Sequence, residues 1–316
     1  MSPITRRPWR RYNGMLRLGV DLGGTKIEVA VLDAAGQFVF RERLPTPQGK
    51  YEGTVEAIAS LVQRAETAVG GVDSIGIGTP GAISPRSGLI KNANSVVLND
   101  KPLKQDIETR LNRSVAMAND ANCLALSEAR DGAAAGATSV FGVILGTGVG
   151  GALVFNGALI AGHNAIAGEW GHNPLPWPTA DELPAPPCWC GKLGCTEQWL
   201  SGPAFARDYA QGAGRALSGA KSGADIITQA QAGDAAAIAA LNRYTDRLAR
   251  ALAQVINLFD PEVIVLGGGM SNVAALYADV PLLWQPFVFS DAIDTRLVAP
   301  KFGDSSGVRG AAFLSS

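Results

Sequence analysis

Short apolar runs separated by glycine-containing turns open the patterned part of the sequence. Residues 16–20, 27–32 and 37–44 are rich in apolar and β-branched side chains and predict three strands. Residues 52–69 repeat apolar positions at helical spacing, which predicts an amphipathic helix, and residues 74–78 predict a fourth strand that ends at a turn. This order of elements is typical of an α/β domain.

The same alternation returns further along the chain. A short apolar stretch, 115–118, leads into a helix-like run, and residues 140–145 and 152–155 predict two strands around a glycine-rich turn. Residues 236–260 carry apolar side chains at helical spacing, and residues 262–266 predict a strand before another glycine-rich turn. Because strand, turn and helix recur in the same order, the pattern predicts a duplicated α/β unit.

Length and charge narrow the class of protein. At about 150 residues per domain, the 316 residues predict two domains. Lysine and arginine total 27, and aspartate and glutamate total 28, so the net charge of −1 argues against a nucleic-acid or membrane-surface partner. No apolar run reaches the roughly 18 residues that a membrane span needs.

The N-terminus and the cysteines indicate the compartment. Residues 1–14 are basic, contain prolines and lack an apolar core segment, so we expect a disordered leader rather than a secretory signal. The folded domain is then expected to begin at Met15. Three of the four cysteines lie between Cys188 and Cys195, which is no disulfide framework and favours the reducing cytoplasm.

Three glycine-rich turns, each after a predicted strand, are candidates for binding nucleotide phosphates. Glycine has no Cβ, so its backbone N–H can approach phosphate oxygens, and a carboxylate beside such a turn can hold a hydrated Mg²⁺. The first turn lies between two strands, so it matches neither the Rossmann fingerprint nor the P-loop. One such turn alone is usually structural, but three together favour nucleotide binding. The candidate residues are Asp21, Gly23, Gly24, Thr25 and Lys26; Gly146, Thr147, Gly148, Gly150 and Gly151; and Gly267, Gly268 and Gly269.

Three closely spaced cysteines predict a structural Zn²⁺ site. Cys188, Cys190 and Cys195 offer three thiolates, and tetrahedral zinc requires a fourth ligand. Of the two histidines, His172 is the better candidate, because it lies just before the proline-rich loop 174–187 that leads to the cysteines. Three cysteines and one histidine close the coordination shell, which indicates a structural metal. Cys123 is separate, and we expect it to be a small buried residue.

A few polar side chains near these motifs suit a polyol substrate. Asp120 follows the apolar stretch 115–118, where it can be a general base for a substrate hydroxyl or simply a helix cap. Glu169 and His172 share one short segment, and Glu197 follows the cysteines. Clustered groups of this kind both donate to and accept from sugar hydroxyls, although isolated charges are more often on a solvated surface.

Taken in order, these motifs resemble the ROK family of repressors, open reading frames and sugar kinases. Residues 21–26 resemble its first phosphate motif, and residues 167–172 followed by 188–197 resemble its zinc and sugar signature. The resemblance covers residues 16 to about 314. Within the family, the chain is most similar to bacterial fructokinases and manno(fructo)kinases, and the segments that carry this are 91–95, 168–177 and 303–312.

The resemblance implies an actin/hexokinase-like (ribonuclease H-like) fold, a duplicated two-domain α/β architecture with a central cleft. The small domain would comprise residues 15–118 plus 300–316, and the large domain, with the zinc-bearing loop, residues 119–299. The partners it implies are a small-molecule sugar, a nucleotide and a second copy of the chain in a homodimer.

The resemblance also assigns roles to residues. Asp120 takes the catalytic-base position, drawing the proton from the 6-hydroxyl of fructose, or of mannose, as that hydroxyl attacks ATP. One ring nitrogen of His172 would bind zinc while the other faces the sugar, so the metal would fix the orientation of the ring. The sugar-contacting positions that the resemblance implies are Gly81, Asn94, Asn119, Asp120, Glu169, His172 and Glu197.

Two alternatives stay open beside a fructokinase. A glucokinase or an N-acetylglucosamine kinase of the same family differs by small changes in the pocket. A sugar-responsive ROK regulator would carry the same zinc and sugar motifs. Such repressors place a winged helix-turn-helix ahead of the sugar domain, whereas only fourteen residues precede Met15 and the phosphate motif at residues 21–25 is intact, so we expect an enzyme.

Overall fold

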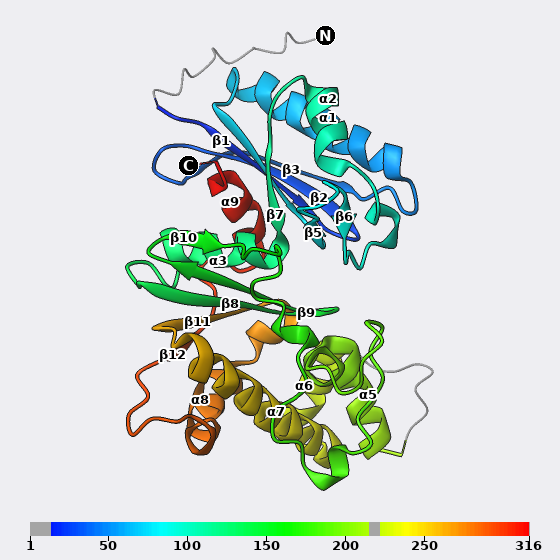
Figure 1. Cartoon of the computed structure of the whole chain (residues 1–316), viewed down its shortest axis with the longest axis vertical. Helices are drawn as coiled ribbons and strands as arrows, with labels where there is room; N and C mark the ends of the chain where they lie inside the picture. Colours follow the sequence, from blue (N-terminus) through cyan, green and yellow to red (C-terminus); the bar gives the residue numbers. More distant parts are fainter. Residues whose placement is uncertain (1–13, 215–221, 316) are drawn as a thin grey trace, which may run out of the picture. The chain divides into compact units, whose positions relative to one another are not determined.

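The structure is a computed structural model that describes residues 14–214 and 222–315 (Figure 1). The expected leader lies outside the described residues, apart from Gly14. The chain divides into two compact units, one of residues up to 127 together with those from 305 onward, and one of residues 128–304. The division falls inside helix α3 (Asp120–Arg130), whereas the sequence predicts a boundary before Asn119 and another before residue 300.

The first unit is built on a mixed five-stranded sheet. Strand β2 runs antiparallel to β3 and to β1, whereas β4 and β7 run parallel to β1. In sheet order the strands are β3 (Phe38–Pro45), β2 (Lys26–Leu32), β1 (Arg17–Leu22), β4 (Ser74–Thr79) and β7 (Ala116–Asn119). A small ribbon of β5 (Ala82–Ile83) and β6 (Ile90–Lys91) and a 3₁₀ turn, η1 (Val96–Leu98), complete the loops.

Helices cover both faces of this sheet (Figure 1). Helices α1 (Tyr51–Val69) and α2 (Leu103–Leu111) lie on one side, and α9 (Ser306–Phe313) contacts β1, β2 and β4. Two glycines allow α9 to lie directly on the strands. A Cβ on Gly19 would fall 2.0 Å from the carbonyl oxygen of Val308, and one on Gly76 would fall 1.8 Å from that of Ala311.

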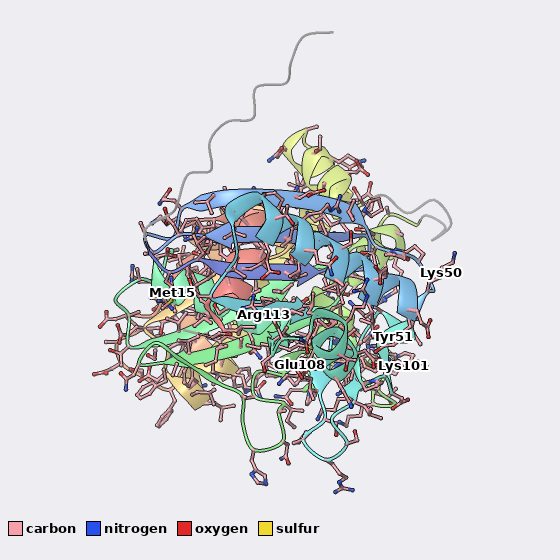
Figure 2. The ribbon with its side chains drawn as sticks, turned by 90° about the horizontal axis from the view of Figure 1, so that it is seen from above. Met15, Lys50, Tyr51, Lys101, Glu108 and Arg113 are labelled. Atoms are coloured by element: carbon pink, nitrogen blue, oxygen red, sulfur yellow. The ribbon has the colours of Figure 1, made fainter. Side chains whose placement is uncertain are left out.

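Polar side chains fix α2 against α1 (Figure 2). The hydroxyl of Tyr51, at the start of α1, donates to the Asp106 carboxylate, and the ammonium of Lys101 lies 5.5 Å from the Tyr51 ring centroid. At the other end, Arg113 pairs with Glu66 of α1. These contacts position the segment between β4 and β7, which carries two of the predicted sugar-binding residues, Gly81 and Asn94.

The second unit repeats the same sheet topology. Its order is β10 (Ala158–Ile160), β9 (Val149–Phe155), β8 (Ser139–Leu145), β11 (Val263–Gly267) and β12 (Arg296–Val298), again with three antiparallel and two parallel strands. This repetition confirms the predicted duplication. The sequence predicts that β9 starts at Ala152, but it starts at Val149, because Gly150 and Gly151 pair with Ile144 and Val143 of β8.

A long, largely buried helix, α7 (Ala235–Phe259), is the centre of the second core. Packed around it are α4 (Glu197–Leu200), α5 (Gly202–Gly212), α6 (Gly223–Gln231) and α8 (Ala274–Leu283). Single 3₁₀ turns lie in the connections: η2 (Trp170–His172), η3 (Ala180–Glu182), η4 (Gly269–Asn272), η5 (Gln285–Phe287) and, at the end of the unit, η6 (Gly303–Ser305).

The sequence predicts an irregular loop over residues 174–187, but part of this segment is a 3₁₀ helix. The stretch from Thr179 to Leu183 contains no proline, and η3 forms there, with Thr179 and Glu182 in a capping box. Among the helices of the described residues, none has the length and apolar character needed to cross a membrane.

Candidate functional site

The three cysteines and His172 form one compact cluster in the second unit. The ligand atoms of His172, Cys188, Cys190 and Cys195 all lie within 4.8 Å of one another. Tetrahedral zinc with bonds of about 2.3 Å separates its sulfur ligands by about 3.8 Å. Cys190 Sγ lies 3.5 Å from Cys195 Sγ, and His172 Nδ1 lies 3.7 Å from Cys188 Sγ, so the donor set fits zinc. Nδ1 faces the thiolates, which leaves Nε2 for another partner.

A tight hairpin presents the cysteines. The N–H of Cys188 donates to the carbonyl of Lys192 at 2.8 Å, and the turn between them passes through Gly191 at a φ of 86°. A backbone N–H at Lys192 lowers the pKa of Cys190, whereas burial raises the pKa of Cys195. An isolated antiparallel β-bridge pairs the backbone of Cys195 with that of Pro174, which follows the His172 segment. The local fold therefore assembles the four ligands from two segments.

Glu197 and an unpredicted residue, Trp189, lie beside this cluster. The Trp189 indole N–H donates to Glu197 Oε1 at 2.8 Å, and the Val149 N–H donates to Glu197 Oε2 at 3.1 Å. The Trp189 ring packs edge-on against His172 with a centroid distance of 5.0 Å. Trp189 thus links Glu197 to His172. Trp189 was missed because an aromatic residue between two cysteines carries no signal of its own.

Glycines press the Glu169 segment onto strand β9. A Cβ on Gly168 would fall 2.3 Å from the carbonyl oxygen of Gly151, and the Trp170 indole donates to the carbonyl of Gly150 at 2.9 Å. Gly148 leaves room for Glu197 in the same way. Three glycines predicted to bind phosphate, Gly148, Gly150 and Gly151, therefore have a packing role next to Glu169, His172 and Glu197.

A buried ion network ties the proline-rich loop to α7. Arg250 donates to both Glu182 carboxylate oxygens at 2.7 and 3.0 Å, and Arg247 donates to one of them at 2.8 Å. Burial alone would raise the pKa of Glu182, but the hydrogen bonds from Arg250 and Arg247 outweigh it and lower the pKa to about 2. Glu182 is therefore charged at neutral pH and holds the loop that leads to Cys188.

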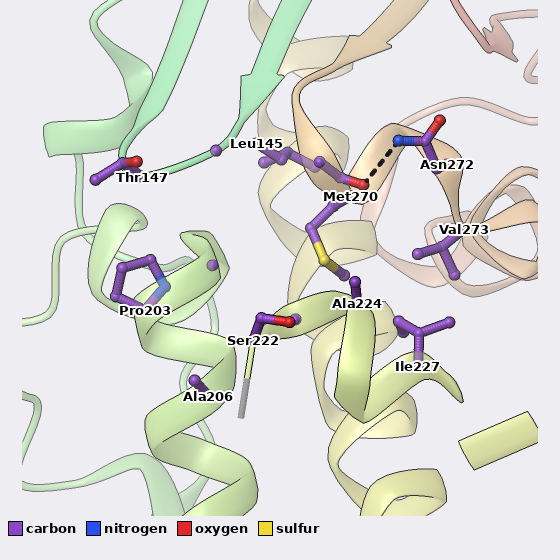
Figure 3. Close-up of a pocket in the computed structure, with 14 residues that line it drawn as sticks. Leu145, Thr147, Pro203, Ala206, Ser222, Ala224, Ile227, Met270, Asn272 and Val273 are labelled. Carbon is purple, nitrogen blue, oxygen red and sulfur yellow. Dashed lines mark hydrogen bonds between the residues drawn. The ribbon is translucent and has the colours of Figure 1, made fainter. Parts of the chain in front are cut away.

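An apolar cavity of about 540 Å³ lies elsewhere in the second unit (Figure 3). Asn272 closes one side of it by donating to the carbonyl of Gly269. Of the predicted ATP residues, Gly146, Thr147 and Gly269 line the cavity, whereas Gly267 and Gly268 do not. The lining residues are Leu145, Gly146, Thr147, Gly202, Pro203, Ala206, Ser222, Gly223, Ala224, Ile227, Gly269, Met270, Asn272 and Val273. A cavity with apolar walls and few polar groups suits a flat ring such as a purine.

In the first unit, the glycine turn between β1 and β2 is exposed and firmly held. The hydroxyl of Thr46 donates to the carbonyl of Gly23 at 2.7 Å, and the Gln48 amide donates to that of Gly24 at 2.6 Å. Gly24 and Thr25 face solvent, and Lys26 begins β2. The Gly23 N–H donates to the carbonyl of Lys26 at 3.0 Å, so the N–H groups of Gly24 and Thr25 are the ones that a ligand would meet.

Asp21 precedes this turn and lies within electrostatic reach of Asp120. Burial, followed by the negative charge of Asp120, raises the pKa of Asp21 to about 7. Gly307 of α9 allows close approach, because a Cβ there would lie 3.0 Å from Asp21 Oδ2. The two predicted carboxylates, one for the cation and one for proton transfer, thus belong to one cluster.

Asn119 and Asp120 lie where β7 meets α3. Asn119 Oδ1 accepts the Ala121 N–H at 2.8 Å, and its amide donates to the carbonyl of Gly81 at 3.3 Å. Asp120 Oδ1 accepts the same N–H at 2.8 Å. Asp120 therefore does contribute to the helix start, as the alternative interpretation of this residue states, but Asn119 shares that role.

The loop with Asn94 is shaped by Asn99, which the sequence did not single out. The Asn99 side chain accepts the Ala93 N–H at 2.8 Å and donates to the Ala93 carbonyl at 3.0 Å. Asn94 is exposed, and Gly81, at a φ of 74°, passes close to the backbone of Lys91 and Ala93. Gly81, Asn94 and Asn119 therefore come from neighbouring segments. Cys123 is buried and free, as predicted.

Comparison with known proteins identifies the family. A family model described as "ROK family" matches residues 17–316. The chain belongs to the ROK family. An N-acetyl-D-glucosamine kinase from Aliivibrio salmonicida is 40% identical over 301 residues, covering 94% of this chain and 98% of that protein.

Two solved ROK structures are similar over nearly the whole chain. The ROK hexokinase from Thermus thermophilus is 32% identical, with a TM-score of 0.82 over 95% of this chain and 97% of that one. A ROK family glucokinase from Streptomyces griseus, in complex with glucose and AMPPNP, is 30% identical, with a TM-score of 0.79 over 95% and 98%. These likenesses confirm the expected α/β actin/hexokinase-like fold.

The raised pKa of Asp21 predicts a pH-dependent stability. Asp21 takes up a proton on folding between about pH 4 and pH 7, so the free energy of unfolding falls as the pH rises through this window, by about 1.4 kcal/mol per pH unit for one proton. In Asp21→Asn this contribution is absent, and urea unfolding without Mg²⁺ at pH 5 and at pH 6.5 should show a shallower dependence. Asp279→Asn, at an exposed position, should match the wild type. Equal slopes for all three proteins would refute the raised pKa.

The thiolate cluster predicts bound zinc. Elemental analysis of the purified chain should find about one zinc ion per chain, and Cys190→Ser should lose most of it and unfold at a lower temperature. Cys123→Ala, which removes the cysteine outside the cluster, should keep its zinc. A wild-type protein without zinc, or full zinc in Cys190→Ser, would contradict the assignment.

Proposed function

We propose that the chain is an ATP-dependent hexose kinase that phosphorylates the 6-hydroxyl of its sugar. The observation that carries this proposal is the clustering of Asp21 with Asp120 in the first unit, together with the His172–Glu197 arrangement and the apolar cavity in the second. The family supports it, because two ROK relatives are named N-acetyl-D-glucosamine kinase and glucokinase, and the latter was solved with glucose and an ATP analogue.

Asp120 is the base in this proposal. Phosphoryl transfer requires little covalent help from the protein, so a positioned hydroxyl and stabilisation of the developing charge are sufficient. Asp120 accepts the proton of the sugar hydroxyl as its oxygen attacks the γ-phosphorus and ADP leaves. Glu169, Glu197 and His172 Nε2 bind other hydroxyls, and Asn119 and Asn94 contribute from the loops of the first unit.

The nucleotide and its cation use the glycine turns. The apolar cavity beside Gly146 and Gly269 takes the adenine ring, and the backbone N–H groups of Gly24 and Thr25 bind phosphate oxygens. The pKa of Asp21 is about 7 when no cation is bound. A nearby Mg²⁺ would favour the charged form of this carboxylate. Zinc, when bound, supplies no reaction step and fixes the His172 ring.

The name of the curated relative favours N-acetylglucosamine as the sugar over fructose. Fructose, with mannose, is the second candidate, because residues 91–95, 168–177 and 303–312 resemble those of manno(fructo)kinases. Glucose is the third. Side-chain positions that differ by tenths of an ångström separate such substrates, so turnover has to decide between them.

The decisive experiment measures ADP release with Mg-ATP and each of four sugars: N-acetylglucosamine, fructose, mannose and glucose. Turnover with at least one sugar is expected, and Asp120→Asn should lower kcat by about 100-fold or more, because the base is lost, while sugar affinity changes little. Asp279→Asn is the matched control and should retain full activity.

The outcomes separate the candidates. Turnover with N-acetylglucosamine alone supports the first sugar, and turnover with fructose or mannose supports the second. Near-normal turnover in Asp120→Asn would refute the base. Sugar binding without any turnover in the wild type would overturn the kinase proposal in favour of a sugar-responsive regulator.

A further inference from the structure

Glu197 is a half-buried carboxylate whose orientation depends on two neutral donors. In the described part of the chain, the hydrogen bonds to its oxygens come from the Trp189 indole and from the Val149 backbone. The last torsion of a glutamate side chain has only broad preferences, so these two bonds, more than the rotamer, set the direction of the carboxylate. A carboxylate offers about four acceptor positions, which leaves two of them for a ligand.

The start of strand β9 fixes one of the two oxygens. The Val149 N–H donates to Glu197 Oε2 at 3.1 Å. A Cβ on Gly148 would lie 2.7 Å from the same oxygen, so this oxygen packs directly against the backbone. The position of the other oxygen, Oε1, therefore depends on the side chain of Trp189.

Trp189 is held both at its backbone and at its ring. Its chain neighbours, Cys188 and Cys190, belong to the metal-binding cluster, and backbone hydrogen bonds close the hairpin that carries them. The indole packs edge-on against His172, the histidine of the cluster, with a centroid distance of 5.0 Å and an interplanar angle of 89°. The indole N–H is thus presented at a defined point, 2.8 Å from Glu197 Oε1.

Burial does not account for a tryptophan at this position. Trp189 is 64% exposed, so its ring gains little from the removal of apolar surface from water. The ring instead makes two polar-site contacts, one with His172 and one with Glu197. A side chain that packs on one residue expected to bind the sugar and orients a second is well placed to act on sugar binding.

We infer that Trp189 is a positioning residue for the sugar, through which the metal-binding cluster sets the direction of the Glu197 carboxylate. The inference rests on the proposed function, in which Glu197 and His172 Nε2 bind sugar hydroxyls. Trp189 acts through Glu197 and does not itself contact the substrate.

Loss of the indole N–H would release Glu197 Oε1 while Oε2 stays bonded to Val149. The carboxylate would then adopt several orientations about its last torsion, and a sugar would have to restrict them on binding. This cost falls on the bound sugar and on the transition state alike, so the KM for the sugar rises while kcat changes little. Nucleotide binding should not change, because Trp189 does not line the apolar cavity at Gly146 and Gly269.

The variant Trp189→Phe tests the inference, because it keeps an aromatic ring beside His172 and removes the N–H. The ligand is the sugar, among the four named above, that binds the wild type most tightly. Calorimetric titration should show its dissociation constant raised about tenfold in Trp189→Phe, because a hydrogen bond to a charged group is lost. The KM should rise by the same factor, with kcat, AMPPNP affinity and zinc content unchanged.

A second background separates a positioning role from a direct contact with the sugar. Two residues that act through one interaction have non-additive effects when both are replaced. In Glu197→Ala, the further change Trp189→Phe should therefore leave the dissociation constant of the sugar unchanged. An additional tenfold loss in this background would show that the indole acts without Glu197 and would overturn the inference.

The matched control is Trp177→Phe, at a 48%-exposed tryptophan whose ring packs on Phe287. It should bind the sugar as the wild type does. A Trp189→Phe protein with the sugar affinity of the wild type would overturn the inference, and so would one that loses its zinc together with its sugar affinity.

The same measurements distinguish this inference from the proposed function. A wild type that binds a sugar without phosphorylating it would refute the kinase alone, because the sugar affinities of the variants can still be compared. An active wild type whose sugar affinity is unchanged by Trp189→Phe would refute the positioning role alone.

Discussion

The convergence of three thiols and one imidazole on a single point is the constraint on which the positions of His172 and Glu197 in the second unit depend. The four ligand atoms lie within 4.8 Å of one another but come from two segments separated by a long proline-rich loop. Holding them together sets the His172 ring, and the Trp189 hydrogen bond carries that order to Glu197. The same hairpin leads into α4, so the position of Glu197 follows from the cluster and not from a strand or a long helix.

In the first unit, close contact between a helix and the sheet brings two carboxylates near each other. Glycines let α9 lie directly on β1 and β4, and this packing buries Asp21 close to the negative charge of Asp120. Burial, and after it the charge of Asp120, raises the pKa of Asp21. A site with this unfavourable charge balance favours a cation, which agrees with the use of Mg-ATP in the proposed reaction.

Strong local sequence patterns predict much of the fold and part of the candidate site. The strands around Asp21, the helix α7 and the duplicated topology follow from apolar periodicity, and the zinc ligands follow from cysteine spacing. The start of β9 was missed because the glycines at 150 and 151 are typical of a turn, whereas the missing Cβ of Gly151 allows close contact with Gly168 and Trp170. Asn99, Trp189 and the Glu182–Arg250 pair act through contacts distant in sequence, which no local pattern encodes. The preferred sugar depends on side-chain positions finer than any motif.

In the proposed function, zinc bound by the His172 cluster orders the residues that we expect to bind the sugar but not those that we expect to bind the nucleotide. Calorimetric titration of zinc-loaded and chelator-treated protein tests this claim directly. The protein is titrated first with the sugar that it phosphorylates and then with AMPPNP. We expect zinc removal to weaken sugar binding by about tenfold or more and to leave nucleotide binding unchanged, because the cavity at Gly146 and Gly269 contains none of the metal-ligand residues. Sugar affinity that survives zinc removal, or an equal loss of both affinities, would contradict it.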